Sequence, residues 1–172
     1  MNLPAAATPE PLLVVIGCGN LNRSDDGAGV RVIHQLRSDF GGSLPAGVKL
    51  FDAGTGGMEV MFQARGARQL IVVDACRSGS EAGAIFRLPG SEIDTAHQPA
   101  YSLHDFRWDH AVHAGRRIFG DAFPNDLTVF LIEAGSLDFG TELTAPVSRA
   151  VGRVCGHIAP HIRDWRATEV PP

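Results

Sequence analysis

The sequence predicts an α/β fold: a single three-layer domain over residues 1–172, with a mostly parallel, twisted sheet of about five strands and helices on both faces. Three observations predict it. Short, continuous apolar runs recur along the chain, as they do in strands that are buried on both faces. Amphipathic helical patterns separate these runs, and strands that alternate with helices form parallel sheets through right-handed crossovers. The length of 172 residues suits one domain.

The expected strands are short apolar runs, most of which end at a glycine or an acidic residue. They cover residues 12–16, 48–51, 70–73, 84–88 and 127–132. The run at 84–88 is the least regular of them.

Helical periodicity follows three of these runs. Apolar residues at helical spacing predict one helix beginning near Gly29, a second after Asp105 and a third after Thr144. In the third helix Thr144 is a suitable N-cap, and Pro146 lies in the first turn, where a missing N–H removes no intrahelical bond. Pro160 is expected to end or kink this helix.

Composition excludes several classes of function. The net charge of −4 and the isoelectric point near 5.9 argue against a nucleic-acid partner, because phosphate binding requires a basic surface. No apolar stretch is long enough to span a membrane, so no membrane partner is expected. The three cysteines are widely spaced and form no C-x-x-C pair, which favours a reducing compartment and a cytoplasmic location. The segments 1–11 and 167–172 are expected to be flexible.

Acidic residues follow several of the expected strands. In an open α/β sheet, ligands bind beyond the carboxyl ends of the strands, so these residues are candidates for one site on exposed loops. They are Asp25, Asp26, Asp52, Asp74 and Glu133. Clustered carboxylates repel one another unless a cation or protons neutralise them, and a bound metal ion would do so. The alternative is that each acid ends a strand or caps a helix, and for Asp25 this alternative is as well supported.

A histidine would complete such a metal site. His104 lies in the segment YSLHD, after the fourth expected strand and just before a helix, where a loop can fold over the sheet edge. His110 and His113 have ligand spacing, but Arg116 and Arg117 share the face of His113 and disfavour a further cation.

A glycine pattern after the first strand also suggests a nucleotide site, which two features exclude. Gly17 and Gly19 match the start of G-x-G-x-x-G, but Asn22 occupies the third glycine position. Asp25 and Asp26 would then stand close to a pyrophosphate at the helix N-terminus and repel it. No nucleotide cofactor is expected.

Five segments, in order, resemble the hydrogenase maturation proteases. They are GCGNLNRSDDGAGV, DAGTGG, IVVDA, YSLHD and the run from LIEAG to LTAPVSRAV, which together span nearly the whole chain. The resemblance implies that Asp26, Asp74 and His104 are metal ligands, with Asp26 at a position where the family has Glu or Asp. Two carboxylates and an imidazole suit a borderline divalent ion such as nickel or zinc.

The resemblance also implies a function. Such enzymes are endopeptidases, grouped with aspartyl-type activity, that remove the C-terminal peptide from the nickel-loaded precursor of a nickel–iron hydrogenase large subunit. The precursor supplies the nickel and is the expected partner. The alternative is a non-proteolytic, nickel-sensing chaperone that docks on the same precursor.

The expected substrate-binding residues are Asn20, Asp52, Gly54, Thr55 and Gly56. The catalytic residues are not assigned by sequence. Water can attack a metal-polarised carbonyl with a carboxylate as base, or the metal can anchor the substrate while backbone N–H groups of residues 54–56 stabilise the oxyanion. Cys18 and Cys76 are expected to be small buried fillers.

Overall fold

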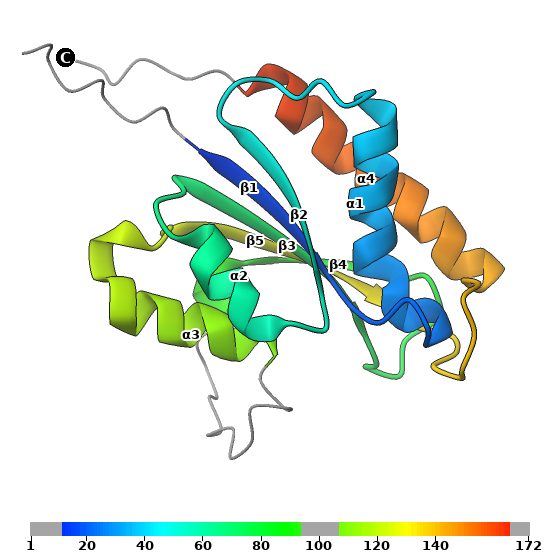
Figure 1. The fold of residues 1–172 in the computed structure, drawn as a ribbon. Coiled ribbons are helices and arrows are strands. Elements are labelled where there is room, and N and C mark those ends of the chain that lie inside the picture. The colour runs from blue at the N-terminus through cyan, green and yellow to red at the C-terminus, as the bar shows by residue number, and fades with distance from the viewer. Residues whose placement is uncertain (1–11, 94–106, 166–172) are drawn as a thin grey trace, which may run out of the picture.

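The computed structural model describes residues 12–93 and 107–165, and in them the chain forms one five-stranded sheet (Figure 1). The strand order is β2-β1-β3-β5-β4, and all neighbours are parallel except the antiparallel pair β4 and β5. The strands are β1 (Leu13–Cys18), β2 (Val48–Gly54), β3 (Gln69–Cys76), β4 (Ile85–Pro89) and β5 (Asp126–Glu133). The mostly parallel sheet predicted from the sequence is therefore confirmed.

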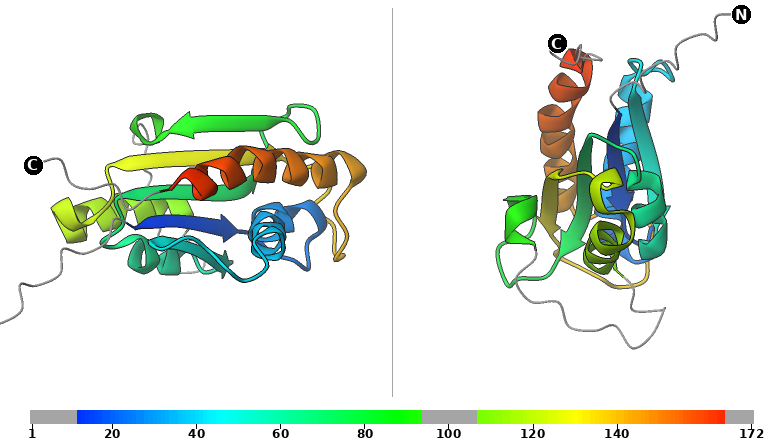
Figure 2. Two further views of the ribbon diagram at one scale, coloured as in Figure 1. Left: turned by 90° about the horizontal axis from the view of Figure 1, so that it is seen from above. Right: turned by 90° about the vertical axis from the view of Figure 1, so that its left-hand side faces the viewer.

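Helices cover both faces of the sheet, which gives the three layers seen in Figure 2. On one face lie α1 (Ala28–Asp39) and α4 (Ala145–Asp164), and on the other lie α2 (Gly57–Ala64) and α3 (Trp108–Phe119). Each pair of helices closes its own apolar core against the alternating side chains of β1, β3 and β5. The strands are buried on both faces, which explains their continuous apolar sequences.

Two helical features differ from the sequence-based expectations. The helix α2 was not predicted, because its eight residues follow a glycine-rich turn directly and are too few for a clear period. Of the two effects expected of Pro160, ending or kinking the last helix, the first is wrong, since α4 continues to Asp164. Pro160 is exposed, while Ile158 and Ile162 on either side of it are buried in the core and hold both parts of the helix on the sheet.

Close packing between α1 and the sheet depends on two glycines. A Cβ on Gly29 would lie 2.2 Å from the carbonyl oxygen of Val73 and 2.4 Å from that of Cys18. A Cβ on Gly17 would lie 2.2 Å from the carbonyl oxygen of Gly29. The glycines therefore let the start of α1 lie directly on β1 and β3, at the end of the sheet where the acidic residues gather.

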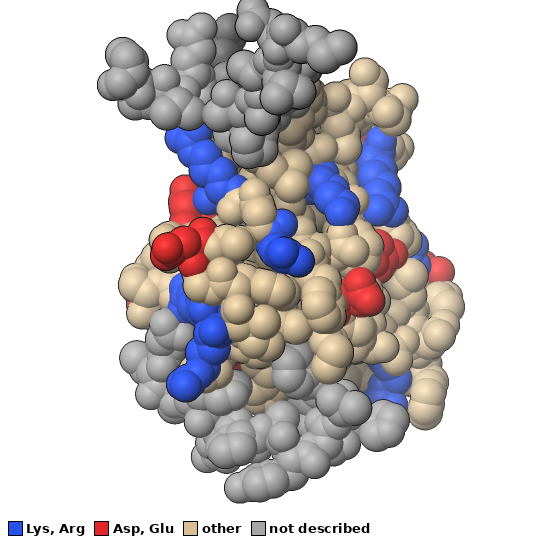
Figure 3. All heavy atoms as spheres, turned by 60° about the vertical axis from the view of Figure 1, so that its left-hand side comes forward, with Lys and Arg blue, Asp and Glu red and all other residues tan. Residues whose placement is uncertain are grey.

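Several expectations lie outside the described residues. These are the flexible segments 1–11 and 167–172, the start of the second expected helix at Asp105, and His104. Among the helices of the described residues, none is long and apolar enough to cross a membrane. On the face shown in Figure 3, basic and acidic side chains are interspersed among uncharged ones.

Candidate functional site

A cavity of about 220 Å³ lies at the carboxyl ends of β1, β2 and β3. This edge cavity is lined by Cys18, Gly19, Asp26, Gly54, Thr55, Gly57, Asp74, Ala75, Arg107 and Trp108. Its wall thus combines residues from three strand ends, the loop before α1, and the first turns of α2 and α3. The position agrees with the rule that open α/β sheets bind ligands beyond the carboxyl ends of their strands.

Asp26 is held in the edge cavity by a tight loop. It lies in a short 3-10 helix, Ser24–Gly27, and its side chain accepts a hydrogen bond from the backbone N–H of Asn20 at 3.0 Å. Gly19 has φ +131°, and a Cβ there would lie 1.8 Å from the carbonyl oxygen of Asp26. The second glycine of the G-x-G pattern is therefore required by this loop rather than by a nucleotide.

Asp74 is more deeply buried than the sequence suggested. It was expected on an exposed loop, but it lies within β3 and is 9% exposed. Burial and, to a smaller extent, the nearby charge of Asp26 raise the pKa of Asp74 to about 6, against the opposing effects of the Ala75 N–H, the charge of Arg107 and the Trp108 side chain. The Ala75 N–H donates to this carboxylate at 2.8 Å. Asp74 therefore takes up a proton near neutral pH more readily than an ordinary aspartate.

Arg107 supplies positive charge at the mouth of the edge cavity. Its Nη2 lies 3.8 Å from Oδ2 of Asp74, and its Nε lies 3.9 Å from Oδ1 of Asp109. The arginine side chain is 62% exposed, so water screens much of its effect. Its positive charge nevertheless lies at the cavity mouth, where it partly balances the negative charges of the two cavity carboxylates.

The cysteines of this region have different surroundings. Cys18 lines the edge cavity and is 7% exposed. Burial, with a further contribution from Asp74, raises the pKa of the Cys18 thiol far above its usual range, so the thiol is protonated at neutral pH. Cys76 donates a hydrogen bond to Glu133 at 3.3 Å, and burial together with that carboxylate raises its pKa to about 12.

Two of the acidic residues are committed to holding loops. The Asp25 side chain is fully buried and accepts hydrogen bonds from the backbone N–H groups of Gly135, Ser136 and Thr144 at 2.7–2.9 Å, and from the Thr144 hydroxyl at 2.8 Å. This favours the structural interpretation of Asp25. Thr144 begins α4 as expected, but its hydroxyl bonds to Asp25 and not to the helix.

Glu133 holds the loop that follows β3. It is 2% exposed and accepts hydrogen bonds from the N–H and hydroxyl of Ser78 and from the N–H of Gly79 at 2.8–3.0 Å. The hydrogen bonds from Ser78 lower the pKa of Glu133 to about 2. Of the acidic residues singled out from the sequence, Asp26 and Asp74 are the ones that line the edge cavity.

Only some of the expected substrate-binding residues line the edge cavity. Gly54 and Thr55 line the edge cavity, whereas Asn20, Asp52 and Gly56 are not among its lining residues. Asp52 accepts hydrogen bonds from the Gly54 N–H at 2.9 Å and pairs with Nε2 of His34 at 2.9 Å. The Gly56 N–H donates to the Ala53 carbonyl at 2.8 Å. The backbone donors of Gly54 and Gly56 are therefore already engaged.

The structure does not describe His104, so its role stays a prediction. His110 accepts a hydrogen bond from the Arg107 N–H at 3.3 Å, which places its Nδ1 at the N-terminus of α3. Within residues 12–93 and 107–165, no three acidic, cysteine or histidine side chains are grouped to hold a metal ion. A ligand set larger than Asp26 and Asp74 thus requires a residue beyond that part of the chain or a group from the substrate.

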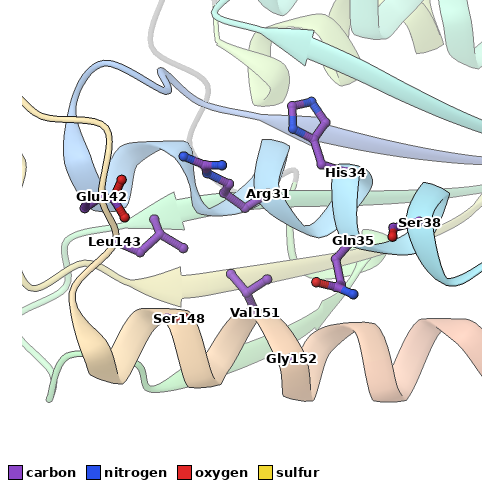
Figure 4. Close-up of a pocket in the computed structure, with 9 residues that line it drawn as sticks. All are labelled: Arg31, His34, Gln35, Ser38, Glu142, Leu143, Ser148, Val151 and Gly152. Carbon is purple, nitrogen blue, oxygen red and sulfur yellow. The ribbon is translucent and has the colours of Figure 1, made fainter.

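A larger groove, of about 480 Å³, lies between α1 and α4 (Figure 4). It is lined by helix-surface residues that include Arg31, His34 and Gln35, and its acidic residue, Glu142, is exposed. The edge cavity is smaller but contains a buried carboxylate with a raised pKa, which is the property expected of a functional site. We therefore take the edge cavity as the candidate site.

The sequence analysis missed four residues that line the cavity, Gly57, Ala75, Arg107 and Trp108, of which Trp108 is the largest. Trp108 was not singled out because an apolar aromatic at the start of a helix is ordinary core material. The segment YSLHD that precedes it was the available signal, since α3 begins four residues after His104 and brings its first turn to the edge cavity.

Comparison with known proteins gives consistent results. The family described as hydrogenase maturation protease matches residues 30–161. Hydrogenase expression/formation protein HoxM of Azotobacter vinelandii is 30% identical over 139 residues, which cover 80% of this chain and 65% of that protein. Hydrogenase 2 maturation protease of Escherichia coli strain K12 is 27% identical over 160 residues, which cover 92% of this chain and 95% of that protein.

A solved structure shares the fold. The hydrogenase maturating endopeptidase HybD from E. coli superposes with a TM-score of 0.75 at 26% identity, over 89% of this chain and 93% of that one. The maturation protease HybD from Thermococcus kodakarensis gives a TM-score of 0.66 at 16% identity, over 88% of this chain and 99% of that one, which shows the fold alone.

Proposed function

The chain belongs to the hydrogenase maturation protease family, and on this premise we propose that it removes the C-terminal peptide from the nickel-loaded precursor of a nickel–iron hydrogenase large subunit. The observation that carries the proposal is the edge cavity, in which Asp26 and Asp74 stand together beyond the strand ends. Two carboxylates near each other repel unless a cation lies between or beside them. The nickel of the precursor is such a cation, and it would arrive with the substrate.

In this proposal Asp26 and Asp74 hold the precursor's nickel, and His104 is the third ligand. Carboxylate and imidazole are ligands that nickel and zinc accept. The exposed Arg107 beside Asp74 balances part of the carboxylate charge before the precursor binds. A metal ion with few protein ligands keeps coordination positions open for groups of the substrate. Such a site suits the recognition of a metal ion that the substrate itself carries.

The contacts near the cavity favour attack by water over an oxyanion site built from residues 54–56. Gly54 and Gly56 already donate their backbone N–H groups to Asp52 and to Ala53. Peptide hydrolysis by water needs a base near the cut bond, and a buried carboxylate can accept that proton. The three cysteines are all free, which supports a reducing compartment such as the cytoplasm for this activity.

Cleavage of purified precursor tests the proposal. Nickel-loaded precursor should lose its C-terminal peptide, detected as a mass decrease, while nickel-free precursor should stay intact at any protease concentration. The variants Asp26→Ala, Asp74→Ala and His104→Ala should each abolish cleavage, and His113→Ala is the matched control that should stay active. Binding of the nickel-loaded precursor without any cleavage would favour the chaperone function. Equal cleavage of nickel-free precursor would remove nickel from the recognition step.

A further inference from the structure

Trp108 has a buried hydrogen-bond donor that the fold does not use. The residue opens α3, lines the edge cavity and is 6% exposed. Among the described residues its indole Nε1–H has no hydrogen-bond partner. A buried donor without a partner costs about 1–3 kcal/mol, so folded proteins keep few of them, and those they keep are commonly tied to function.

The donor stands beside Asp74. It is close enough to the Asp74 carboxylate to lower the pKa of that group, but the two do not reach hydrogen-bonding geometry. One carboxylate oxygen of Asp74 already accepts a hydrogen bond from the Ala75 N–H, and the other lies beside the Arg107 guanidinium. If the fold used Trp108 to hold Asp74, that charge-assisted bond would already be made, because such bonds are worth about 1.5–3 kcal/mol.

The Trp108 indole is the neutral, buried donor of the cavity wall, where Arg107 offers a charged and largely exposed one. Gly54 and Gly56, which the sequence suggested as backbone donors, are engaged within their own turn. A peptide that enters a dry cavity must find donors for its carbonyl oxygens, because an unsatisfied buried carbonyl costs as much as an unsatisfied N–H. The indole N–H is a donor only and carries no charge, so it suits a neutral oxygen acceptor.

We propose that the indole N–H of Trp108 binds a backbone carbonyl oxygen of the precursor beside the bond to be cut. This inference rests on the proposed function and adds a substrate-binding residue to it. Binding of the peptide then supplies the partner that Trp108 lacks in the free protein. The tryptophan orients the peptide next to Asp74 and does not itself hold the metal.

Trp108→Phe is the direct test, because phenylalanine keeps an aromatic ring in the core and removes the donor. The value of kcat/KM for nickel-loaded precursor should fall by roughly 10- to 100-fold. The melting temperature of the free variant should fall only slightly, because removal of an unpartnered buried donor offsets part of the packing lost with the smaller ring. Its affinity for Ni²⁺, measured by calorimetry, should match that of the unsubstituted protein. Trp165→Phe, at the end of α4, is the matched control and should cleave normally.

Three outcomes of these measurements would count against the inference. The first is a kcat/KM within about twofold of the unsubstituted enzyme, which is smaller than the loss of one hydrogen bond to substrate predicts. The second is a parallel loss of melting temperature and Ni²⁺ affinity, which would make Trp108 a positioning residue for Asp74. Loss of cleavage in Trp165→Phe as well would point to a general structural effect and would also count against it.

A spectroscopic test separates this inference from the proposed function. Trp108 and Trp165 are the two tryptophans of the chain, so protein labelled with ¹⁵N-tryptophan has two indole resonances, which Trp165→Phe assigns. Unlabelled nickel-loaded precursor, made uncleavable by proline after the cut bond where cutting is found, should move the Trp108 indole proton downfield. A downfield shift in the complex, together with no cleavage of the unsubstituted nickel-loaded precursor in a parallel assay, would support the inference and defeat the protease function. Normal cleavage with an unmoved Trp108 resonance in the bound complex would support the protease function and overturn the inference on Trp108.

Discussion

At the scale of single residues, the site contains a carboxylate that the fold tolerates at a cost. Asp74 lies in a central strand and is 9% exposed, and its pKa is raised to about 6 chiefly by burial. A carboxyl group whose pKa is higher in the folded state destabilises the fold as the pH rises above its unfolded pKa, and the loss is complete above its folded pKa. The metal-free site is therefore under electrostatic strain at neutral pH, which a cation would relieve.

Asp74→Asn should separate stability from activity. In the presence of a chelator at pH 8, the free energy of unfolding of the variant should exceed that of the unsubstituted protein by up to about 3 kcal/mol, because the buried charge is gone. Cleavage should be abolished. Thermal or urea unfolding measures the first effect and precursor processing the second. The matched control is Asp26→Asn, which is half-buried and should change stability little. An Asp74→Asn protein less stable than its parent would contradict this account.

At the scale of secondary-structure elements, the position of α1 determines the shape of the candidate site. Gly29 lies where a side chain would meet the backbone oxygens of Val73 and Cys18, and those atoms belong to the strands that end at the edge cavity. Backbone atoms of central strands cannot move aside as a flexible side chain can. Any substituent at Gly29 must therefore lift the start of α1 from the sheet.

Gly29→Ala should destabilise the protein by about 3 kcal/mol or more, which exceeds the usual cost of one extra methyl group in a core because both neighbours are backbone. Gly152→Ala is the control on α4, where an added Cβ meets nothing within 4 Å. That substitution should be neutral or should stabilise by up to about 1 kcal/mol, as alanine favours helix more than glycine does. Equal stabilities for the two variants, measured by urea unfolding, would exclude the close packing described.

The connection between the loop before α1 and the start of α4 depends on Asp25. Its carboxylate gathers three backbone N–H groups and one hydroxyl from residues 110 to 119 positions away in sequence. Asp25→Ala leaves these buried donors without an acceptor and should destabilise by about 3–5 kcal/mol. Asp26→Ala, its neighbour, should lose cleavage with a small change in unfolding free energy. Similar melting temperatures for the two variants would show that the adjacent carboxylates do not have these separate roles.

At the scale of the whole molecule, two perturbed carboxylates shape the dependence of stability on pH. Asp74 has a folded pKa of about 6, above its usual value of 3.8, so its contribution to stability is present at low pH and is lost as the pH rises through 6. Glu133 has a folded pKa of about 2, below its usual value of 4.5, so its contribution is present above 4.5 and is lost as the pH falls toward 2. The two effects have opposite signs, and their pH windows, from 3.8 to about 6 for Asp74 and from 4.5 to about 2 for Glu133, overlap only near pH 4.

The metal-free protein should therefore become more stable as the pH is lowered from 7 to about 5, and less stable below about 4.5. Unfolding curves recorded with a chelator across this range measure the profile. Asp74→Asn should flatten the upper limb alone, and Glu133→Gln should flatten the lower limb alone. An upper limb that persists unchanged in Asp74→Asn would assign it to another group.

Local sequence patterns were enough to predict the fold class, the family and the order of the strands and helices apart from α2. These follow from local patterns: continuous apolar runs for strands buried on both faces, helical spacing between them, and motifs at the strand ends. The convergence of Asp26 and Asp74 on one edge was predictable for the same reason, because parallel strands bring their carboxyl ends together. The short helix α2 was not predicted, because its eight residues are too few to show a clear helical period.

The division of the acidic residues between the cavity and the loops became visible only in the folded protein. Asp25 and Asp26 are adjacent and identical in type, yet one meets donors from beyond β5 and the other lines the cavity. The burial of Asp74 and the unpartnered indole N–H of Trp108 were equally invisible in the sequence. These properties depend on long-range packing, because the donors and apolar neighbours of a polar group come from distant segments of the chain. Sequence patterns place a residue on an element, but only packing determines whether water, a proton or another residue becomes its partner.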